Sequence, residues 1–316
     1  MLAVVLDGKI EVREVPEPRP SAGEALVRVL MAGICGTDLA LLDGYKDFKG
    51  ILGHEMVGIV EEAPDPRWLG ARVVAEINVS CGTCSLCREG HRKHCENRGV
   101  LGLLGRPGAF AERLTVPLAN LHRVPDSLSD EEAVWTEPLA AAMAVAEWGV
   151  RSGDAVIVLG DGRLGSLVAL GLQYLGARVE IVGKQEIKLG LLEKLGLRVN
   201  RGEPRPIHPW VVEATGTVSG LEQSLCWTKP RGTLILKSTC HDFANLNTSR
   251  IVVDEIRVIG SRCGDFQPAL EALQSGRIPV RRLVSKVFPL TKAKEAFLEC
   301  ASPSVFKVLL DLRDLD

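Results

Sequence analysis

The stretch that most limits the fold of this chain is a glycine fingerprint between two apolar strands. Residues 155–159 form a continuous apolar run, residues 160–165 read Gly-Asp-Gly-Arg-Leu-Gly, and a helical pattern follows to Leu175. A branched apolar run over residues 179–182 then predicts a second, parallel strand. The glycines allow a tight turn and the close approach of a pyrophosphate to the helix N-terminus. The segment therefore predicts a doubly wound parallel sheet that binds a dinucleotide.

The residues after the second strand bear on the choice of cofactor. An acid that binds a ribose 2′-hydroxyl is expected there, but Gly183 and Lys184 occupy the position. Glycine leaves room and lysine supplies charge for a 2′-phosphate, so we hypothesise a preference for NADP over NAD. The alternative is that Lys184 is an ordinary solvated residue at a helix start. A later strand, residues 211–214, ends at Thr215 and Gly216. The candidate cofactor-binding residues are Gly160, Asp161, Gly162, Arg163, Leu164, Gly165, Gly183, Lys184, Thr215 and Gly216.

Four cysteines form the most specific motif in the chain. Cys81, Cys84, Cys87 and Cys95 have the spacing C-x2-C-x2-C-x7-C. Four thiolates this close can surround one Zn²⁺ and leave no open position, which is typical of a structural zinc site. An iron–sulfur cluster is an alternative, because short C-x2-C-x2-C runs also hold clusters, and four unrelated thiols are another. His91 and His94 in the same segment are predicted to be surface residues.

A second candidate metal site lies between residues 33 and 55. The segment begins Gly33-Ile34-Cys35-Gly36-Thr37-Asp38 and ends Gly53-His54-Glu55. Cysteine, histidine and glutamate bind zinc in sites that keep one position open for substrate. The alternative is a buried cysteine and an unrelated histidine in a turn. Glu137, before Pro138, is either a carboxylate at a helix N-terminus or one directed at the metal, and the local sequence leaves both open.

The rest of the chain divides into a β-rich region and a region of alternating strands and helices. Apolar runs and proline-rich turns over residues 1–137 indicate a barrel-like β region with the cysteine lobe at 81–95. Residues 138–270 alternate as a doubly wound sheet does. A helix over 266–273 and strand patterns at 280–288 and 305–312 predict that residues 271–316 return to the first domain. Only about ten residues separate Val199 from Val211, so a loop with Pro204, Pro206 and Pro209 is predicted to replace one crossover helix.

Composition limits the class of protein. A chain of 316 residues has room for about two domains, and a net charge of −2 without charge runs gives no surface for nucleic acid or anionic membranes. The N-terminal residues lack a signal-peptide pattern, and the most apolar window, residues 155–172, is interrupted by Asp161 and Arg163. Nine cysteines without a secretory signal indicate metal ligands and reduced thiols. We expect a cytoplasmic enzyme with no nucleic-acid partner and no membrane span.

Taken in order, these motifs resemble those of the zinc-dependent medium-chain dehydrogenase/reductase family, which includes alcohol, sorbitol, threonine and glucose dehydrogenases. The resemblance rests on residues 33–38 and 53–55, the four cysteines, Glu137-Pro138 and the fingerprint at 160–165, and it covers essentially the whole chain. It implies an α/β fold in which a GroES-like β-rich catalytic domain, built from both chain ends, accompanies a Rossmann domain. It also implies two zinc ions per chain, NADP or NAD as cofactor, and a homodimer or homotetramer.

The resemblance implies a role for each matching residue. Cys35 and His54 would be catalytic zinc ligands, with Glu55 and Glu137 as the carboxylates available to the same ion. Thr37 would take the proton of the substrate hydroxyl, and Lys307 would lie near the cofactor pyrophosphate. Ala40 stands where many members have a proton-relay histidine. The structural zinc ligands would be Cys81, Cys84, Cys87 and Cys95.

The expected function is hydride transfer between an alcohol, polyol or sugar hydroxyl, or the matching carbonyl, and a nicotinamide cofactor. Zinc would act as a Lewis acid on the substrate oxygen. One site catalyses both directions, so a dehydrogenase and a carbonyl reductase both remain open. The alternative from another class is a non-catalytic dinucleotide-binding redox sensor or scaffold. The open metal site favours the enzyme.

Overall fold

The computed structural model describes residues 1–202, 207–240 and 244–315, and the chain forms two compact units. The first unit contains Met1–Glu137, Phe266–Gln274 and Val280–Asp316, and the second contains Pro138–Asp265 and Ser275–Pro279. The sequence placed the return to the first domain at residue 271. In the structure, a helix of the first unit already begins at Phe266, and a short segment then belongs to the second unit.

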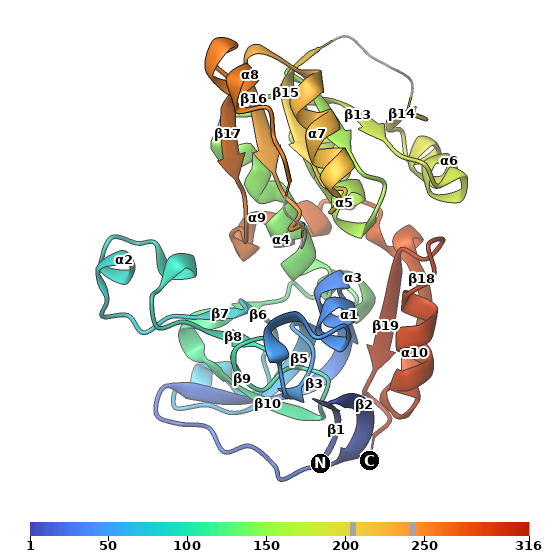
Figure 1. Ribbon diagram of the computed structural model, residues 1–316. Coiled ribbons are helices and arrows are strands. Elements are labelled where there is room, and N and C mark those ends of the chain that lie inside the picture. Colours follow the sequence, from blue (N-terminus) through green and yellow to red (C-terminus); the bar gives the residue numbers. More distant parts are fainter. Residues whose placement is uncertain (203–206, 241–243, 316) are drawn as a thin grey trace. The chain divides into compact units, whose positions relative to one another are not determined.

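The second unit is built on one six-stranded parallel sheet (Figure 1). Its strands are β12 (Ala155–Leu159), β13 (Arg178–Val182), β14 (Arg198–Asn200), β15 (His208–Glu213), β16 (Thr228–Leu236) and β17 (Arg257–Gly260). Their order is β14-β13-β12-β15-β16-β17. Relative to the first strand this is the order 3-2-1-4-5-6 of dinucleotide-binding folds, in which ligands bind beyond the carboxyl ends of the central strands. The predicted doubly wound parallel sheet is confirmed.

Helices connect the strands of this sheet and cover its apolar side chains. They are α5 (Arg163–Tyr174), α6 (Glu186–Lys194), α7 (Val218–Trp227) and α8 (Thr248–Val253), whereas α4 (Thr136–Met143) comes before the first strand of the sheet. Helix α5 begins directly after the glycine turn, as the fingerprint predicts, and α7 packs on β15 and β16. Ile157, Val211 and Leu234, from three neighbouring strands, are fully buried in one cluster. Their burial fixes the strand ends at which the fingerprint lies.

The connection from β14 to β15 contains no helix within the described residues. Pro204 and Pro206 of the predicted loop lie outside the described residues. Pro209 was expected in the same loop but lies in β15. Strand β14 forms one edge of the sheet beside β13, whereas β15 pairs with β12 on the side away from β13. The connection from β14 to β15 therefore passes over β13 and β12.

The first unit is rich in short strands, as the sequence predicted. They are β1 (Leu2–Asp7), β2 (Lys9–Glu14), β3 (Glu24–Gly33), β4 (Gly50–Ile51), β5 (Glu55–Glu62), β6 (Arg72–Ala75), β7 (Asn78–Val79), β8 (Gly99–Leu101), β9 (Gly105–Arg106), β10 (Arg113–Pro117), β11 (Leu121–Arg123), β18 (Val284–Pro289) and β19 (Lys307–Asp311). Seven of them form the largest sheet, with the order β11-β6-β5-β3-β19-β18 and β10 on β3. The pattern over residues 280–288 is strand only from Val284, because a 3-10 turn comes before it.

Strand β3 organises the first unit. It pairs with β5 along one edge, and with β10 and β19 along the other. Nine of its ten residues are buried, which explains a nearly continuous apolar sequence in place of an alternating one. Because β19 comes from the end of the sequence, residues far apart in the chain meet at the carboxyl end of β3.

Short helices complete the first unit. They are α1 (Gly36–Leu42), α2 (Ser85–Arg88), α3 (Asp130–Ala133), α9 (Phe266–Gln274) and α10 (Ala293–Cys300). Helix α10 packs on β18 and β19, and α2 lies in the cysteine lobe, which extends beyond β7 and β8 (Figure 1). Among the described residues, no helix combines the length and the apolar character that a bilayer crossing requires.

Candidate metal and dinucleotide sites

The ends of β3 and β5 bring three candidate zinc ligands together. Gly33, the last residue of β3, pairs with Glu55, the first residue of β5. Cys35 follows as the N-cap of α1, and His54 precedes Glu55. The Cys35 sulfur, a His54 ring nitrogen and a Glu55 carboxylate oxygen all lie within 4.8 Å of one another. Glu137 does not belong to this group of ligand atoms.

Asp38 holds this cluster in place and was not singled out by its sequence. It is fully buried, and its Oδ2 accepts a hydrogen bond of 2.8 Å from the Cys35 backbone N–H. Its Oδ1 lies 3.3 Å from His54 Nδ1. A carboxylate on one ring nitrogen orients the imidazole so that the other nitrogen faces the ligand position. The local signal was the position of Asp38 three residues after Cys35, where a side chain can bond back to the helix N-cap.

The charged state of His54 follows from the same contacts. Burial alone would lower the pKa of the imidazole, but the Asp38 carboxylate and the Cys35 thiol reverse this and raise the pKa well above its ordinary value. Without a bound metal, His54 therefore keeps its second ring proton, and its positive charge, to a higher pH than an ordinary histidine. A metal ion that binds the ring nitrogen must displace this proton.

A buried ion pair lies on the other side of Glu55. Lys307 in β19 is 2% exposed, and its Nζ donates to Glu55 Oε2. The same ammonium lies 5.3 Å from the centre of the Trp135 ring. A Cβ at Gly33 would collide with the Glu55 carboxylate and the Lys307 side chain, so glycine leaves both side chains room to meet here. In the first unit, Lys307 thus acts as the partner of Glu55.

The charges of the cluster fit a divalent metal ion. When ionised, Cys35, Asp38 and Glu55 carry three negative charges, and Lys307 supplies one positive charge. Buried charges are unfavourable unless they are balanced, and these groups are buried or half-buried. A divalent cation would leave the five side chains, including neutral His54, without net charge. The soft sulfur, imidazole and carboxylate set is the one that open zinc sites use.

Thr37 lies beside the cluster. Its hydroxyl oxygen is 3.8 Å from the Cys35 sulfur, and its side chain is half-buried. A substrate oxygen bound at an open metal position next to Cys35 would lie close to this hydroxyl. The structure thus places the Thr37 hydroxyl next to the cluster, and its role in proton transfer remains a prediction.

We expect metal binding at this cluster to weaken as pH falls, and to do so above the ordinary pKa of histidine. At pH values below the raised pKa of His54, the zinc affinity should fall by as much as tenfold for each pH unit, because the metal must displace the His54 proton. Asp38→Asn should shift this dependence to lower pH, because it removes the negative charge that raises the pKa. Zinc affinity measured from pH 6 to 9 in both proteins tests this. Cys35 is the same in the wild type and in Asp38→Asn, so any difference between their pH profiles of zinc affinity reports on His54. Identical pH profiles would contradict the role of His54.

The four cysteines of the lobe form a second, closed group. All four sulfurs lie within 4.8 Å of one another, and Cys95 Sγ is 3.5 Å from Cys81 Sγ and 3.9 Å from Cys84 Sγ. A tetrahedral ion with Zn–S bonds of about 2.3 Å places sulfurs roughly 3.8 Å apart. An iron–sulfur cluster has several irons between its thiolates and would hold them farther apart. The geometry favours a single zinc ion over a cluster.

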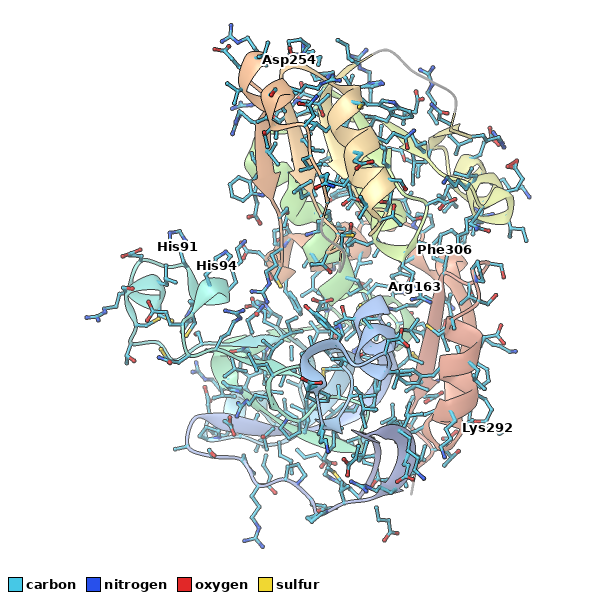
Figure 2. The ribbon with its side chains drawn as sticks, in the orientation of Figure 1. His91, His94, Arg163, Asp254, Lys292 and Phe306 are labelled. Carbon is cyan, nitrogen blue, oxygen red and sulfur yellow. The ribbon has the colours of Figure 1, made fainter. Side chains whose placement is uncertain are left out.

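The thiol protons of the lobe also indicate a cation. Hydrogen bonds from Thr83 and from the Cys84 N–H lower the pKa of Cys81 to about 5. Partial burial and the neighbouring thiols raise the pKa of Cys87 to about 11. Four thiolates so close together repel one another and need a cation at their centre. His91 and His94 are exposed on the outside of the lobe, as the sequence predicted (Figure 2).

Replacing Cys84 by serine should lower the zinc content by about one ion per chain and loosen the lobe. The lobe has little apolar core of its own, so the metal supplies its folding free energy. Limited proteolysis should then cut within residues 81–95, and the melting temperature should fall. Zinc content and fragment masses measure both effects. A variant with unchanged zinc content would show that the lobe does not hold a metal.

The fingerprint glycines of the second unit leave space for a dinucleotide. Gly160 has φ of 116°, and a Cβ there would collide with the Ala214 carbonyl. A Cβ at Gly165 would collide with the Gly160 carbonyl, so α5 can pack closely on the turn. At Gly162, the N-cap of α5, a Cβ would meet nothing within 4 Å. This open approach to the helix N-terminus fits a pyrophosphate, and Arg163 and Leu164 form the first turn beside it.

Glu213 is a residue of this strand edge that the sequence did not reveal. It ends β15 and is 3% exposed. Its Oε1 accepts hydrogen bonds from the backbone N–H groups of Thr215 and Gly216, at 2.6 and 3.2 Å, and its Oε2 accepts one from Ser238. The buried carboxylate therefore fixes the predicted Thr215-Gly216 turn at the carboxyl end of the sheet.

Comparison with known proteins identifies the family. The GroES-like domain of alcohol dehydrogenases matches residues 21–126. The erythritol/L-threitol dehydrogenase of Mycolicibacterium smegmatis is 31% identical over 332 aligned positions, covering 92% of each chain. The chain belongs to the zinc-dependent medium-chain dehydrogenase/reductase family.

Solved structures of this family have the same fold. The alcohol dehydrogenase TADH from Thermus sp. ATN1 superposes with a TM-score of 0.91 and 31% identity, covering 99% of this chain and all of that one. A protein from Sinorhizobium meliloti 1021, described as a zinc-binding dehydrogenase and bound to NADP, has a TM-score of 0.90 and 29% identity, covering 98% and 99%. The GroES-like and Rossmann architecture implied by the motifs is therefore confirmed.

Proposed function

We propose that this protein is a zinc-dependent dehydrogenase that transfers a hydride between a small polyol or sugar and a nicotinamide cofactor. The buried group of Cys35, His54 and Glu55 carries the proposal, because its ligand atoms lie within 4.8 Å of one another and its charges call for a divalent cation. The fingerprint of the second unit supports it with a turn open to a pyrophosphate. The relatives named above support the substrate class, since one of them is a polyol dehydrogenase.

Cys35, His54 and Glu55 would hold the catalytic zinc, and Glu137 remains a candidate for an exchangeable ligand. When bound, zinc supplies a Lewis acid for the substrate oxygen. Asp38 keeps His54 oriented, since it lies 3.3 Å from Nδ1 and is itself fixed by the Cys35 N–H. Cys81, Cys84, Cys87 and Cys95 would hold the structural zinc.

Thr37 would exchange a proton with the substrate hydroxyl. Its hydroxyl, 3.8 Å from the Cys35 sulfur, accepts the proton of the substrate hydroxyl during oxidation and returns it during reduction. Ala40 cannot relay this proton onward, so it passes to water or to a cofactor hydroxyl. The residues of the second unit that bind and orient the cofactor are Gly160, Asp161, Gly162, Arg163, Leu164, Gly165, Gly183, Lys184, Thr215 and Gly216. When bound, the cofactor supplies the hydride acceptor or donor.

Some parts of the sequence prediction remain predictions. They are the catalytic role of the first unit, the cofactor-binding role of the second, the homodimer or homotetramer, and the cytoplasmic location. The approach of Lys307 to the cofactor also remains a prediction.

Zinc analysis combined with a substrate screen tests the proposal. We expect two zinc ions per chain and turnover of a polyol or sugar with NAD or NADP, followed by absorbance of the reduced cofactor. One zinc ion per chain, held by the cysteine lobe, and no turnover of any alcohol, polyol or sugar would overturn the proposal. That result would favour the non-catalytic redox sensor or scaffold.

A further inference from the structure

The carboxylate of Asp161 occupies the strand end at which the expected acid is missing. Asp161 lies in the glycine turn after β12, and Gly183 follows the last residue of β13. A Cβ at Gly183 would collide with the carboxylate of Asp161. An acid at position 183 and the present side chain of Asp161 would therefore compete for the same space.

Two backbone donors fix this carboxylate. Asp161 Oδ2 accepts hydrogen bonds from the N–H groups of Lys184, at 2.8 Å, and Gln185, at 2.6 Å. These donors lie at the start of α6, where Gln185 is the N-cap. The second oxygen, Oδ1, has no hydrogen bond to another residue in the described part of the chain, and the side chain is only half-buried. One oxygen is thus held while the other remains available.

The geometry points to Asp161 as the residue that selects NAD(H) over NADP(H). This assignment rests on the proposed function, because it takes a nicotinamide cofactor to bind at the fingerprint. A carboxylate beyond the end of the second strand can accept a hydrogen bond from a ribose 2′-hydroxyl. In this chain, the carboxylate reaches that place from the turn after the first strand.

The same placement disfavours a 2′-phosphate. Asp161 already accepts from the N–H groups of Lys184 and Gln185, directly before α6, so a phosphate at the strand end would have to compete for these two donors. It would also meet the negative charge of Asp161, and juxtaposed like charges discriminate against a ligand. Gly183 therefore makes room for a carboxylate, and the room that suggested NADP from the sequence is filled.

A binding titration of the full chain with NADH and NADPH tests the assignment without turnover. We expect the wild type to bind NADH more tightly than NADPH by at least about tenfold. Asp161→Asn keeps an oxygen for the two backbone donors but removes the charge. It should lower this ratio by about tenfold, mainly because NADPH binds more tightly.

A charge-relocation variant guards against a folding defect in the single substitution. In Asp161→Ala/Gly183→Asp, the carboxylate returns to the strand end, in the space that the smaller residue 161 vacates. We expect this double variant to prefer NADH, whereas Asp161→Ala alone should lose most of the preference. Circular dichroism of the three variants and of the wild type checks that the fold is unchanged.

Three results would overturn the assignment. The first is a wild type that binds NADPH as tightly as NADH or more tightly. The second is an unchanged ratio in Asp161→Asn, which would transfer the discrimination to another group such as Lys184. Both would leave the proposed function standing, since a nicotinamide cofactor binds. In the third, neither cofactor binds, and the proposed function fails together with this assignment.

Discussion

Replacing Cys35 by serine is expected to lower kcat/KM by roughly a thousandfold or more, equivalent to about 4 kcal/mol of transition-state stabilisation. The serine hydroxyl is a poor zinc ligand, and the remaining pair, His54 and Glu55, does not form a stable site. The zinc content should fall by about one ion per chain. NADH binding should stay within about twofold of the wild type, because the fingerprint lies in the other unit.

A matched control is available on the surface of the second unit. Cys226 is an exposed free cysteine, so Cys226→Ser makes the same chemical change away from both metal groups. Its zinc content and activity should equal those of the wild type. Full activity of Cys35→Ser, or an unchanged zinc content, would refute the catalytic role of this cluster.

Replacing Lys307 by methionine is expected to destabilise the first unit by about 3–5 kcal/mol. Lys307 and Glu55 are 2% and 1% exposed, and removing one partner leaves the other charge buried and unpaired. Denaturant unfolding of the purified full chain, followed in the transition of the first unit, measures this loss of unfolding free energy. The double variant Lys307→Met/Glu55→Gln should recover part of the lost stability, since it removes both charges.

An exposed ion pair serves as the comparison for this variant. Lys286 Nζ lies 3.0 Å from Glu299, but its side chain is 53% exposed. Water and salt screen this pair, so Lys286→Met should cost less than about 1 kcal/mol. Equal effects of the two lysine substitutions would show that the Glu55 charge is stabilised by something other than Lys307.

The regular elements could be predicted where local patterns determine them. The strand at residues 155–159 agrees with β12, and the helix predicted from residue 266 is α9, because continuous or periodic apolar runs are short-range signals. Within the β-rich region, β10 begins only at Arg113, and Ala111 before it forms an isolated bridge with Ala3. A single bridge depends on a partner far away in the sequence, which local patterns do not show.

The candidate ligands could be predicted, but their supporting contacts could not. Residue type and spacing indicated Cys35, His54 and the four cysteines, and the structure brings each set together. The pairing of Glu55 with Lys307 depends on the register between β3 and β19, and Asp161 meets the end of β13 only through the packing of the sheet. Such contacts follow from tertiary structure. From the sequence alone, Gly183 indicated room for a phosphate, whereas the structure places the Asp161 side chain beside it.

Lys307, the ion-pair partner of Glu55, is synthesised long after the candidate zinc ligands. Glu55 and Lys307 are 252 residues apart in the chain, and β19 completes the edge of β3 beside Cys35. While the ribosome is still making the intervening residues, the early part of the first unit lacks this strand and holds its carboxylates without their cation. Domains generally fold from the N-terminal side during translation, whereas the sheet of this unit is completed by a strand from late in the sequence. A chain that ends before β19 still has Cys35, His54 and Glu55, but it lacks the ammonium that balances the Glu55 carboxylate, so we expect its metal cluster to be less stable than that of the full chain.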